Sequence, residues 1–462
     1  MPVSPLYQPL PVYSTLPRQS DPVAPARFPR HRLRHRHQAA AAEVGLDTLS
    51  AEEWEAAFAR FEPLPDNLPT PLALRYHGHQ FMSYNPALGD GRGFLFAQLK
   101  DQRGRLMDLG TKGSGRTPYA RGGDGRLTLK GGVREILAAE LLEARGVPTC
   151  RILSLFETGE HLIRGDEPSP TRSSVMVRLS HGHVRIGMFQ RLEFEDDAPG
   201  MEALLAYCAQ HLTPEVAGAS DLPAAFLAAV ATRLANLTAA WMAAGFVHGV
   251  LNTDNLNITG ESFDYGPWRF LPRFDPAFIA AYFDHSGLYC FARQPSAVLW
   301  SLGQLHDALA LVGDRRTLTA ALTGWEALYN DAFEAAFLRR LGLVGPHEQA
   351  NALIRAWVSW AEAAPVSFEH FFFDWQGGLA SQDRARAGLR GAVYERRDFA
   401  PVREGLRPFL PRDPDALSAQ RYSAEEPCDC LIDEVEALWA HIAERDDWGP
   451  LSEKVNRIRL SH

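Results

Sequence analysis

Short apolar runs separated by glycines dominate the chain between residues 72 and 179. Three of these runs, Phe94–Leu99, Leu106–Leu109 and Ser174–Leu179, have the length and apolar content typical of strands. Before the third run, Gly132–Arg145 repeats apolar residues at helical spacing and is followed by a Gly-Val-Pro stop. The pattern predicts strands, then one helix, then further strands.

The pattern becomes helical in the second part of the chain. Ala224–Ala244 is apolar with helical periodicity and predicts a long helix that stops at Gly245. Beyond it, Leu256–Ile258 and Ser262–Phe263 predict two very short strands joined at Gly260 as a hairpin. Amphipathic helix with many aromatic residues accounts for most of the remainder, from Ser296 to Ala361 and from Leu431 to Glu444.

Composition narrows the class of protein. The chain has 462 residues, 46% of them hydrophobic and 22% charged, which is typical of a globular protein with one large core or two ordinary ones. A net charge of −9 gives nucleic-acid binding no electrostatic support. No run approaches the roughly 18 uncharged apolar residues of a membrane helix, so no membrane partner is expected. Five scattered cysteines favour a reducing, cytoplasmic location.

The first forty residues differ from the rest. They are rich in proline, almost free of acidic residues, and end in the basic run Arg27–His37. A transit peptide is one interpretation, but the prolines disfavour the amphipathic helix that it needs. A strap lying on an acidic surface is the favoured interpretation, and residues 1–70 are assigned to an N-terminal arm and lead-in segment.

The most informative motif follows the predicted long helix. His248 and Asn255 have the offset of a protein-kinase catalytic loop, His-x-Asp-x-x-x-x-Asn, and Asp264 precedes Tyr-Gly as the kinase metal ligand precedes Phe-Gly. The position of the kinase base holds Val250, which cannot accept a proton. Asn255 and Asp264 offer the oxygens that Mg²⁺ prefers, although either alone is more often a turn residue. Their joint spacing favours a metal site.

A lysine and a glutamate form a second candidate pair. Lys112 follows a predicted strand, and Glu135 lies on the predicted helix, as do the phosphate-binding lysine of a kinase and its glutamate partner. Both residue types are more often exposed to solvent. The glycines around Lys112 favour the functional reading, because they let the backbone approach a ligand.

Two glycine loops and two arginines complete the candidate chemistry. Leu88–Gly93 and Gly122–Arg126 can expose N–H groups to phosphate, but Asp-Gly pairs are also ordinary turns. Arg178 lies near the end of the last predicted strand of this region, and Arg185 follows seven residues later; phosphate contacts and structural ion pairs are equally compatible with them.

Histidine pairs and a cysteine pair are weaker candidates. His77/His79 and His181/His183 lack a third ligand at a familiar zinc spacing, so loop histidines are favoured. Cys428-Asp429-Cys430 could be a redox pair or bind metal, with Cys290 as a further disulfide partner, but unmodified thiols are the simpler interpretation.

Several motifs together resemble the selenoprotein O (SelO/YdiU) family of pseudokinase protein adenylyltransferases. They are YHGHQF (Tyr76–Phe81), LGDGRG (Leu88–Gly93), TKGSGRTPYARGGDGR (Thr111–Arg126), VRE (Val133–Glu135), HVRIG (His183–Gly187) and HGVLNTDN…FDYGP (His248–Pro267). The resemblance implies an α+β, protein-kinase-like bilobal fold. It also implies that ATP binds in a flipped orientation, so that AMP is transferred to Ser, Thr or Tyr hydroxyls of proteins.

The resemblance also implies roles for individual residues. Asp254 would be the proton acceptor, which would account for Val250, and Asn255 and Asp264 would bind Mg²⁺ or Mn²⁺. Lys112, paired with Glu135, would contact the phosphates. The nucleotide site would be lined by Gly89, Gly91, Arg92, Asp124, Gly125, Arg178 and Arg185, with Asp264 also contacting ATP.

The predicted elements and motifs lead to a two-lobed architecture and to three hypotheses of function. Residues 71–180 are assigned to a β-rich N-lobe with one key helix, and residues 181–462 to a helical C-lobe that carries the catalytic and metal-binding loops. The leading hypothesis is a protein adenylyltransferase with ATP and protein substrates as partners. The rivals are a γ-phosphoryl kinase that uses Asp254 as its base and a non-catalytic ATP-binding scaffold.

Overall fold

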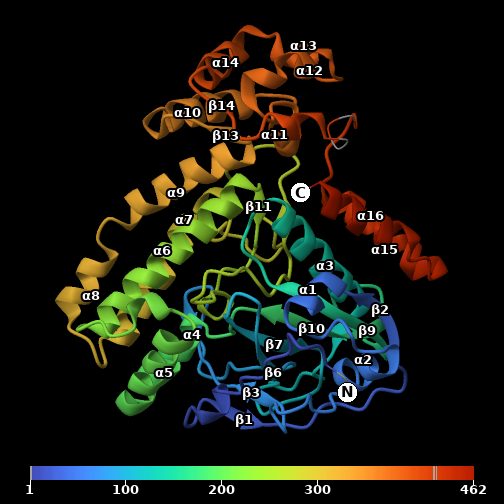
Figure 1. Ribbon diagram of the computed structural model, residues 1–462, viewed down its shortest axis with the longest axis vertical. Helices are drawn as coiled ribbons and strands as arrows, with labels where there is room; N and C mark the ends of the chain where they lie inside the picture. The colour runs from blue at the N-terminus through green and yellow to red at the C-terminus, as the bar shows by residue number, and fades with distance from the viewer. Residues whose placement is uncertain (1–2, 420–421, 423, 462) are drawn as a thin grey trace.

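The computed structural model describes residues 3–419, 422 and 424–461, and its first half is built on an eight-stranded antiparallel sheet (Figure 1). The strand order is β1-β3-β6-β7-β10-β9-β2, with β8 paired to β10. The bounds are β1 Ser20–Pro22, β2 Arg32–Arg36, β3 Leu72–Leu74, β6 Leu95–Lys100, β7 Leu106–Lys112, β8 Leu127–Thr128, β9 Arg151–Leu162 and β10 Thr171–Ser180.

Helices cover both faces of this sheet because its strands are apolar on both sides. Leu95 and Met176 belong to the core that contains α3 (Leu129–Ala144). Their neighbours Phe96 and Val177 belong to a second core, shared with α1 (Gln38–Glu43) and α2 (Ala51–Phe58). Successive strand residues point to opposite faces, so each strand serves both cores.

The sequence predicted three of these strands and the helix. β6, β7 and β10 confirm the predicted runs, and α3 confirms the predicted helix, beginning three residues earlier at Leu129. The twelve-residue strand β9 was not predicted. The basic run contributes β2, which pairs with β9 at the sheet edge. The run is thus an edge strand of the sheet, and its Arg34 forms ion pairs with Glu157 and Asp446.

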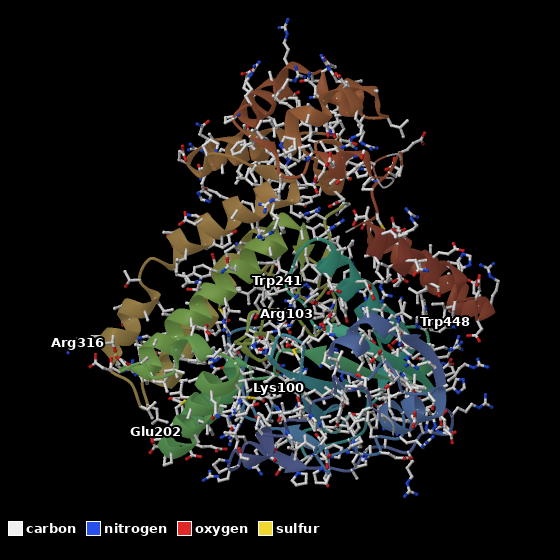
Figure 2. All side chains as sticks on the ribbon, viewed as in Figure 1. Lys100, Arg103, Glu202, Trp241, Arg316 and Trp448 are labelled. Atoms are coloured by element: carbon white, nitrogen blue, oxygen red, sulfur yellow. The ribbon has the colours of Figure 1, made fainter. Side chains whose placement is uncertain are left out.

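The helical part is organised around α6 (Leu222–Ala243), which confirms the predicted long helix. The helices α7, α8 and α9 pack against it, and its Trp241 is 1% exposed (Figure 2). By length and composition alone, α6 could cross a membrane, but a mostly buried core helix passes the same test. The helices are α4 Ile186–Phe194, α5 Ala198–His211, α7 Gln294–Leu309, α8 Arg315–Leu322 and α9 Trp325–Arg340.

The C-terminal part has two pieces. The first is a separate aromatic-rich core at one end of the molecule (Figure 1). It holds β13 Leu343–Val344, α10 Ala350–Ala361, α11 Phe368–Asp374, α12 Gln382–Ala387, α13 Gly391–Tyr394, α14 Ala400–Leu406 and β14 Leu410–Pro411. The second is a pair of helices, α15 (Ile432–Arg445) and α16 (Gly449–Leu460), which lies against α3.

The hairpin predicted around Gly260 is wrong. Within the described residues, Leu256–Ile258 and Ser262–Phe263 do not pair with each other: Asn257 forms a bridge with Arg185, and Ser262 forms one with Thr149. The chain does turn at Gly260, where φ is +76°. The backbone groups of the two arms, however, are bonded to segments that flank β9 and β10, so this loop is held against the sheet lobe.

Candidate active site

A cavity of about 700 Å³ lies where the glycine loops of the sheet lobe meet the loop that follows α6. The strand β7 delivers Lys112 to it, and the short 3-10 turn Thr253–Asn255 delivers Asp254. The structure brings together nearly all of the residues predicted from sequence. Those that line the cavity are Gly89, Gly91, Arg92, Lys112, Asp124, Gly125, Arg178, Arg185, Asp254, Asn255 and Asp264.

Glu135 lies behind Lys112. The two form a buried ion pair, with side chains that are 1% and 7% exposed. Lys112 Nζ also lies 2.5 Å from Asp264 Oδ1, so the lysine bridges two carboxylates. Among the described residues, the second oxygen of Glu135 has no hydrogen-bond partner. The glutamate therefore depends on Lys112 for its charge balance.

Asp264 is surrounded by positively charged side chains. Its Oδ1 lies 3.4 Å from an Arg178 nitrogen as well as close to Lys112. Burial raises the pKa of Asp264, but Lys112, Arg178 and Arg185 outweigh this and hold the pKa well below its usual value. Its φ of +62° is left-handed, a conformation that Asp tolerates better than most residues. The carboxylate is therefore ionised and available to a cation.

Asn255 is the other predicted metal ligand. Its amide nitrogen donates to the Val250 carbonyl at 3.0 Å, which fixes the side chain, and no described residue donates a hydrogen bond to its amide oxygen. An amide oxygen and a carboxylate that both line this cavity suit a hard divalent cation. The donor set of Asn255 and Asp264 thus fits Mg²⁺ or Mn²⁺.

Asp254 has the environment of a general base. It is 8% exposed, and within the described part of the chain its Oδ1 has no hydrogen-bond partner. Burial raises its pKa to about 6, with Arg185 acting in the opposite direction. A carboxylate with a pKa in this range is better suited to accept a proton near neutral pH than an exposed aspartate is.

His248 joins the two halves of the loop motif. Its Nε2 lies 3.1 Å from the Phe263 carbonyl, and its backbone N–H donates to Gln294 Oε1 at 3.0 Å. Burial lowers the pKa of His248, so the ring is neutral and donates from Nε2. The histidine ties Asp254 and Asn255 to the segment that carries Asp264.

The acids and arginines of the glycine loops pair with one another or with nearby side chains. Asp90 lies 3.4 Å from Arg185, and Asp124 lies 2.8 Å from Arg164. Arg178 and Arg185 therefore make ion pairs and also line the cavity, so the two interpretations of these arginines are compatible. Arg92 is exposed at the cavity rim.

Sequence reasoning assigned no role to several residues that line the cavity. Arg121 lies inside the quoted motif Thr111–Arg126, and its membership of that motif was a signal that could have marked it. Arg164 reaches the cavity from the loop after β9, where no motif marks it. Tyr76 and Asn252 also line the cavity; both lie inside quoted motifs, YHGHQF and HGVLNTDN, and membership of those motifs was a signal that could have marked them.

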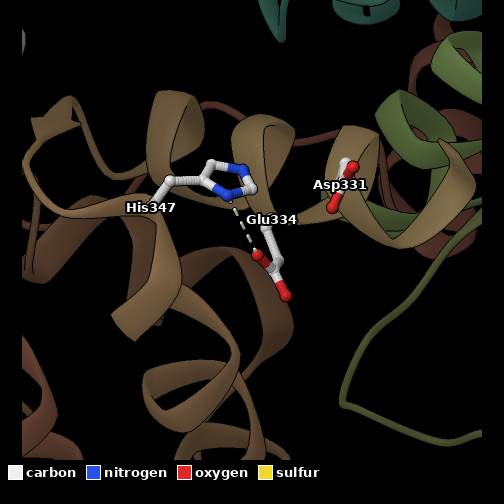
Figure 3. Close-up of side chains that lie close together, drawn as sticks. All are labelled: Asp331, Glu334 and His347. Carbon is white, nitrogen blue, oxygen red and sulfur yellow. Dashed lines mark ion pairs between the residues drawn. The ribbon is translucent and has the colours of Figure 1, made fainter. Parts of the chain in front are cut away.

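Other candidate groups lie elsewhere. Asp331, Glu334 and His347 are close enough to hold a metal ion (Figure 3), but they come from α9 and the turn before α10 and do not line the cavity. A second hollow of about 540 Å³ lies between the ends of α3, α9, α11 and α16; its acids Glu369 and Glu426 are already paired with cations. All five cysteines, which are all described, are free, so the suggested disulfide to Cys290 is not formed.

The chain is similar to known nucleotidyltransferases over nearly its whole length. A family model described as "Protein adenylyltransferase SelO" matches residues 7–459. "Protein nucleotidyltransferase YdiU" of Synechococcus elongatus is 44% identical over 95% of this chain and 92% of that protein. The proteins of that name from Synechocystis sp. (42% identical, 95% of both chains) and Gloeobacter violaceus (44%, 95% and 92%) are similarly close. The chain belongs to the SelO family of protein adenylyltransferases, which confirms the resemblance inferred from its motifs.

Proposed function

We propose that this protein transfers AMP from ATP to Ser, Thr or Tyr hydroxyls of proteins, with ATP reversed in a kinase-like bilobal cleft. The observation that carries the proposal is that Val250 and Asp254 occur together in the same loop. An apolar side chain occupies the position of the kinase base. Four residues further on in the same loop lies a buried carboxylate whose Oδ1 has no hydrogen-bond partner among the described residues. A displaced base suits a reacting phosphorus that is also displaced.

The cations of the cavity suit this chemistry. Lys112, held by Glu135, together with Arg178 and Arg185, would bind the phosphates, while Gly89, Gly91, Arg92, Asp124 and Gly125 would surround the rest of the nucleotide. Positive charge spread along a triphosphate stabilises the transition state and the departing pyrophosphate. The acceptor oxygen would attack the α-phosphorus, its proton would pass to Asp254, and the bond to pyrophosphate would break.

Asn255 and Asp264 would hold the metal ion. When bound, Mg²⁺ or Mn²⁺ would neutralise phosphate charge and align the triphosphate. Asp254 would orient the acceptor hydroxyl and accept its proton, a contribution of about 10²–10⁴ in rate.

The same proposal covers architecture and location. Residues 71–180 would form the N-lobe with α3 as its key helix, and residues 181–462 the C-lobe; residues 1–70, which supply β1, β2, α1 and α2, would be an N-terminal extension of the N-lobe. A cytoplasmic location is supported by the five free cysteines. The partners would be ATP and hydroxyl-bearing proteins, with neither nucleic acid nor membrane involved.

Parallel incubations with α-labelled and γ-labelled ATP test the proposal. The protein, Mg²⁺ or Mn²⁺ and candidate acceptors are incubated, and protein-bound label is measured together with intact mass. Transfer of AMP retains the α-label and adds the mass of AMP. Retention of the γ-label alone would establish a kinase that uses Asp254, and no labelling, with ATP binding unaffected by Asp264→Ala, would establish a scaffold.

A further inference from the structure

The loop that carries Asp254 is held by hydrogen bonds from a segment of the sheet lobe. The hairpin formed by β4 (His79–Gln80) and β5 (Ser83–Tyr84) reaches across to it. The His79 backbone N–H donates to Thr253 Oγ1 at 2.8 Å, and the Phe81 backbone N–H donates to Asn252 Oδ1 at 3.1 Å. Two backbone donors thus hold the two residues immediately before Asp254.

A side chain from α4 closes this arrangement. The Thr253 hydroxyl donates to Gln190 Oε1 at 2.6 Å, and Gln190 Nε2 lies 2.7 Å from His79 Nδ1. Thr253 is fully buried and Gln190 is 3% exposed, so the hydrogen bond between them is shielded from water, whereas His79 is partly exposed. Thr253, Gln190 and His79 therefore form a closed ring of hydrogen bonds between the sheet lobe, α4 and the catalytic loop.

The hairpin is shaped for close approach. Phe81 and Met82 have φ of +49° and +62°, left-handed values at the tip of the two-residue turn. A Cβ on Gly78 would lie 3.0 Å from Thr253 Oγ1 and 3.4 Å from both Asp254 Cβ and Asp254 Oδ1. Left-handed backbone at residues with side chains is retained where the surroundings impose it, often at functional sites.

The Asp254 carboxylate needs such support. Among the residues that the structure describes, its Oδ1 has no hydrogen-bond partner that could fix its direction. Its place is set instead by the main chain of Thr253–Asn255, and that main chain is fixed by the contacts of Asn252 and Thr253.

We propose that Thr253, Gln190 and the backbone of His79–Phe81 form a positioning bracket that aims the Asp254 carboxylate at the acceptor hydroxyl. Thr253, Gln190, His79 and Phe81 do not line the cavity, although Gln80, which lies between His79 and Phe81, does. The bracket acts through Asp254; it deepens the proposed function and rests on it. Because a displacement of about 1 Å in a reacting group can lower the rate about 10²-fold, loss of the bracket affects turnover and not ATP binding.

A set of matched variants of the full-length protein tests the bracket. Thr253→Val keeps the shape and removes the hydroxyl, Thr253→Ser keeps the hydroxyl, and Thr238→Val removes an equally buried hydroxyl of α6. We expect Thr253→Val to lower kcat for AMP transfer 10- to 100-fold with KM for ATP within twofold. Thr253→Ser and Thr238→Val should retain near wild-type kcat.

Gln190→Met provides an independent variant. It should lower kcat as Thr253→Val does, and the double variant should lose no more than either single variant, because both break one ring of hydrogen bonds. Wild-type kcat in Thr253→Val, an equal loss in Thr253→Ser, or a loss confined to KM would each overturn the bracket.

Amide hydrogen exchange separates the bracket from the reaction. Exchange in residues 246–258 should rise in Thr253→Val and Gln190→Met but not in Thr238→Val, whether or not the wild-type protein transfers AMP. If the wild-type protein transfers no label from α-labelled ATP but exchange rises as expected in the two bracket variants, the proposed function is rejected and the bracket is retained. Unchanged exchange in both bracket variants would reject the bracket.

Discussion

Charge pairing decides the chemistry of single residues in this site. Lys112 is shared by Glu135 and Asp264, so one lysine balances a fully buried glutamate and a carboxylate that faces the cavity. Under the proposed function, a metal ion on Asp264 would leave Lys112 to pair with Glu135 and contact phosphate. Asp254 differs from both acids, because burial raises its pKa whereas the cations hold the pKa of Asp264 down.

Removing Lys112 should damage stability as well as activity. Lys112→Met leaves Glu135 as an unpaired buried carboxylate, which costs about 3–5 kcal/mol in the free energy of unfolding, measured by urea denaturation. The double variant Lys112→Met/Glu135→Gln should recover most of that stability while AMP transfer stays near zero. Recovery of transfer in the double variant would show that Lys112 does not serve the nucleotide.

Asp254 should show a trade between stability and activity. Its pKa is raised from 3.8 to about 6, so the folded state binds its proton more tightly than the unfolded state does. The ionised carboxylate therefore costs stability above pH 6, the cost shrinks as pH falls from 6 towards 4, and it is absent below that. Asp254→Asn should raise the free energy of unfolding at pH 7.5 by an amount on the order of 2 kcal/mol and make little difference at pH 4.

The same pKa predicts how transfer depends on pH. Wild-type transfer should fall as pH drops through about 6, because a protonated Asp254 cannot accept the hydroxyl proton. Asp254→Asn should lower transfer about 10²–10⁴-fold at pH 7.5 while leaving ATP affinity largely intact. Full transfer by Asp254→Asn, measured with α-labelled ATP, would assign the base to another group.

At the level of elements, the C-terminal helices hold both the sheet edge and α3. Asp446 begins the turn between α15 and α16 and accepts hydrogen bonds from Arg32, Arg34 and Arg172. Arg459 of α16 forms a two-point ion pair with Glu140 on α3. Because α3 carries Glu135, these contacts connect the end of the chain to the active site.

Asp446 should therefore control the docking of α15 and α16. Its partially exposed carboxylate has a lowered pKa, since hydrogen bonds from Trp448, Arg172 and Arg34 outweigh the effect of burial, so its stabilisation is present above the usual pKa of aspartate and lost as pH falls below it. We expect Asp446→Ala to raise hydrogen exchange of residues 432–460 about tenfold. Asp446→Asn should have a smaller effect, because asparagine tolerates the φ of +51°.

The matched control for Asp446 is Arg386→Ala. It removes a two-point arginine–glutamate pair from an exposed part of α12, where solvent screens such pairs and they add little stability. Exchange of residues 432–460 should stay unchanged in this control. Equal exchange in Asp446→Ala and wild type would mean that apolar packing alone docks the two helices.

The sequence predicted the features that depend on interactions between nearby residues and missed those that depend on residues far apart in the chain. Periodicity identified α3, α6 and three strands. Motif spacing identified Asn255 and Asp264, the glycines around Lys112 marked that residue, and the family resemblance added Asp254. The hairpin at Gly260 was wrong because its backbone bonds to distant segments. The bracket from His79 to Thr253 joins residues 174 positions apart, a separation that no local pattern reports.

At the scale of the whole molecule, one cavity between the two lobes should couple ligand binding to global stability. Its walls come from the sheet lobe and from the loop after α6, so ATP bound there would have to be released before either part unfolds. A ligand at 100 times its Kd stabilises the native state by about 2.7 kcal/mol. ATP with Mg²⁺ or Mn²⁺ should therefore raise the melting temperature of the intact protein.

Removing the metal should show which acidic group holds it. EDTA, or the variant Asp264→Asn, should abolish the part of this stabilisation that depends on the divalent ion. Glu334→Gln, which alters the metal-sized group on α9, should leave that part unchanged, since Glu334 and His347 lie outside the cavity lining (Figure 3). The opposite pattern, with Glu334→Gln eliminating the metal effect and Asp264→Asn preserving it, would move the metal away from the phosphates. AMP transfer would then have to proceed on the charge of Lys112, Arg178 and Arg185 alone.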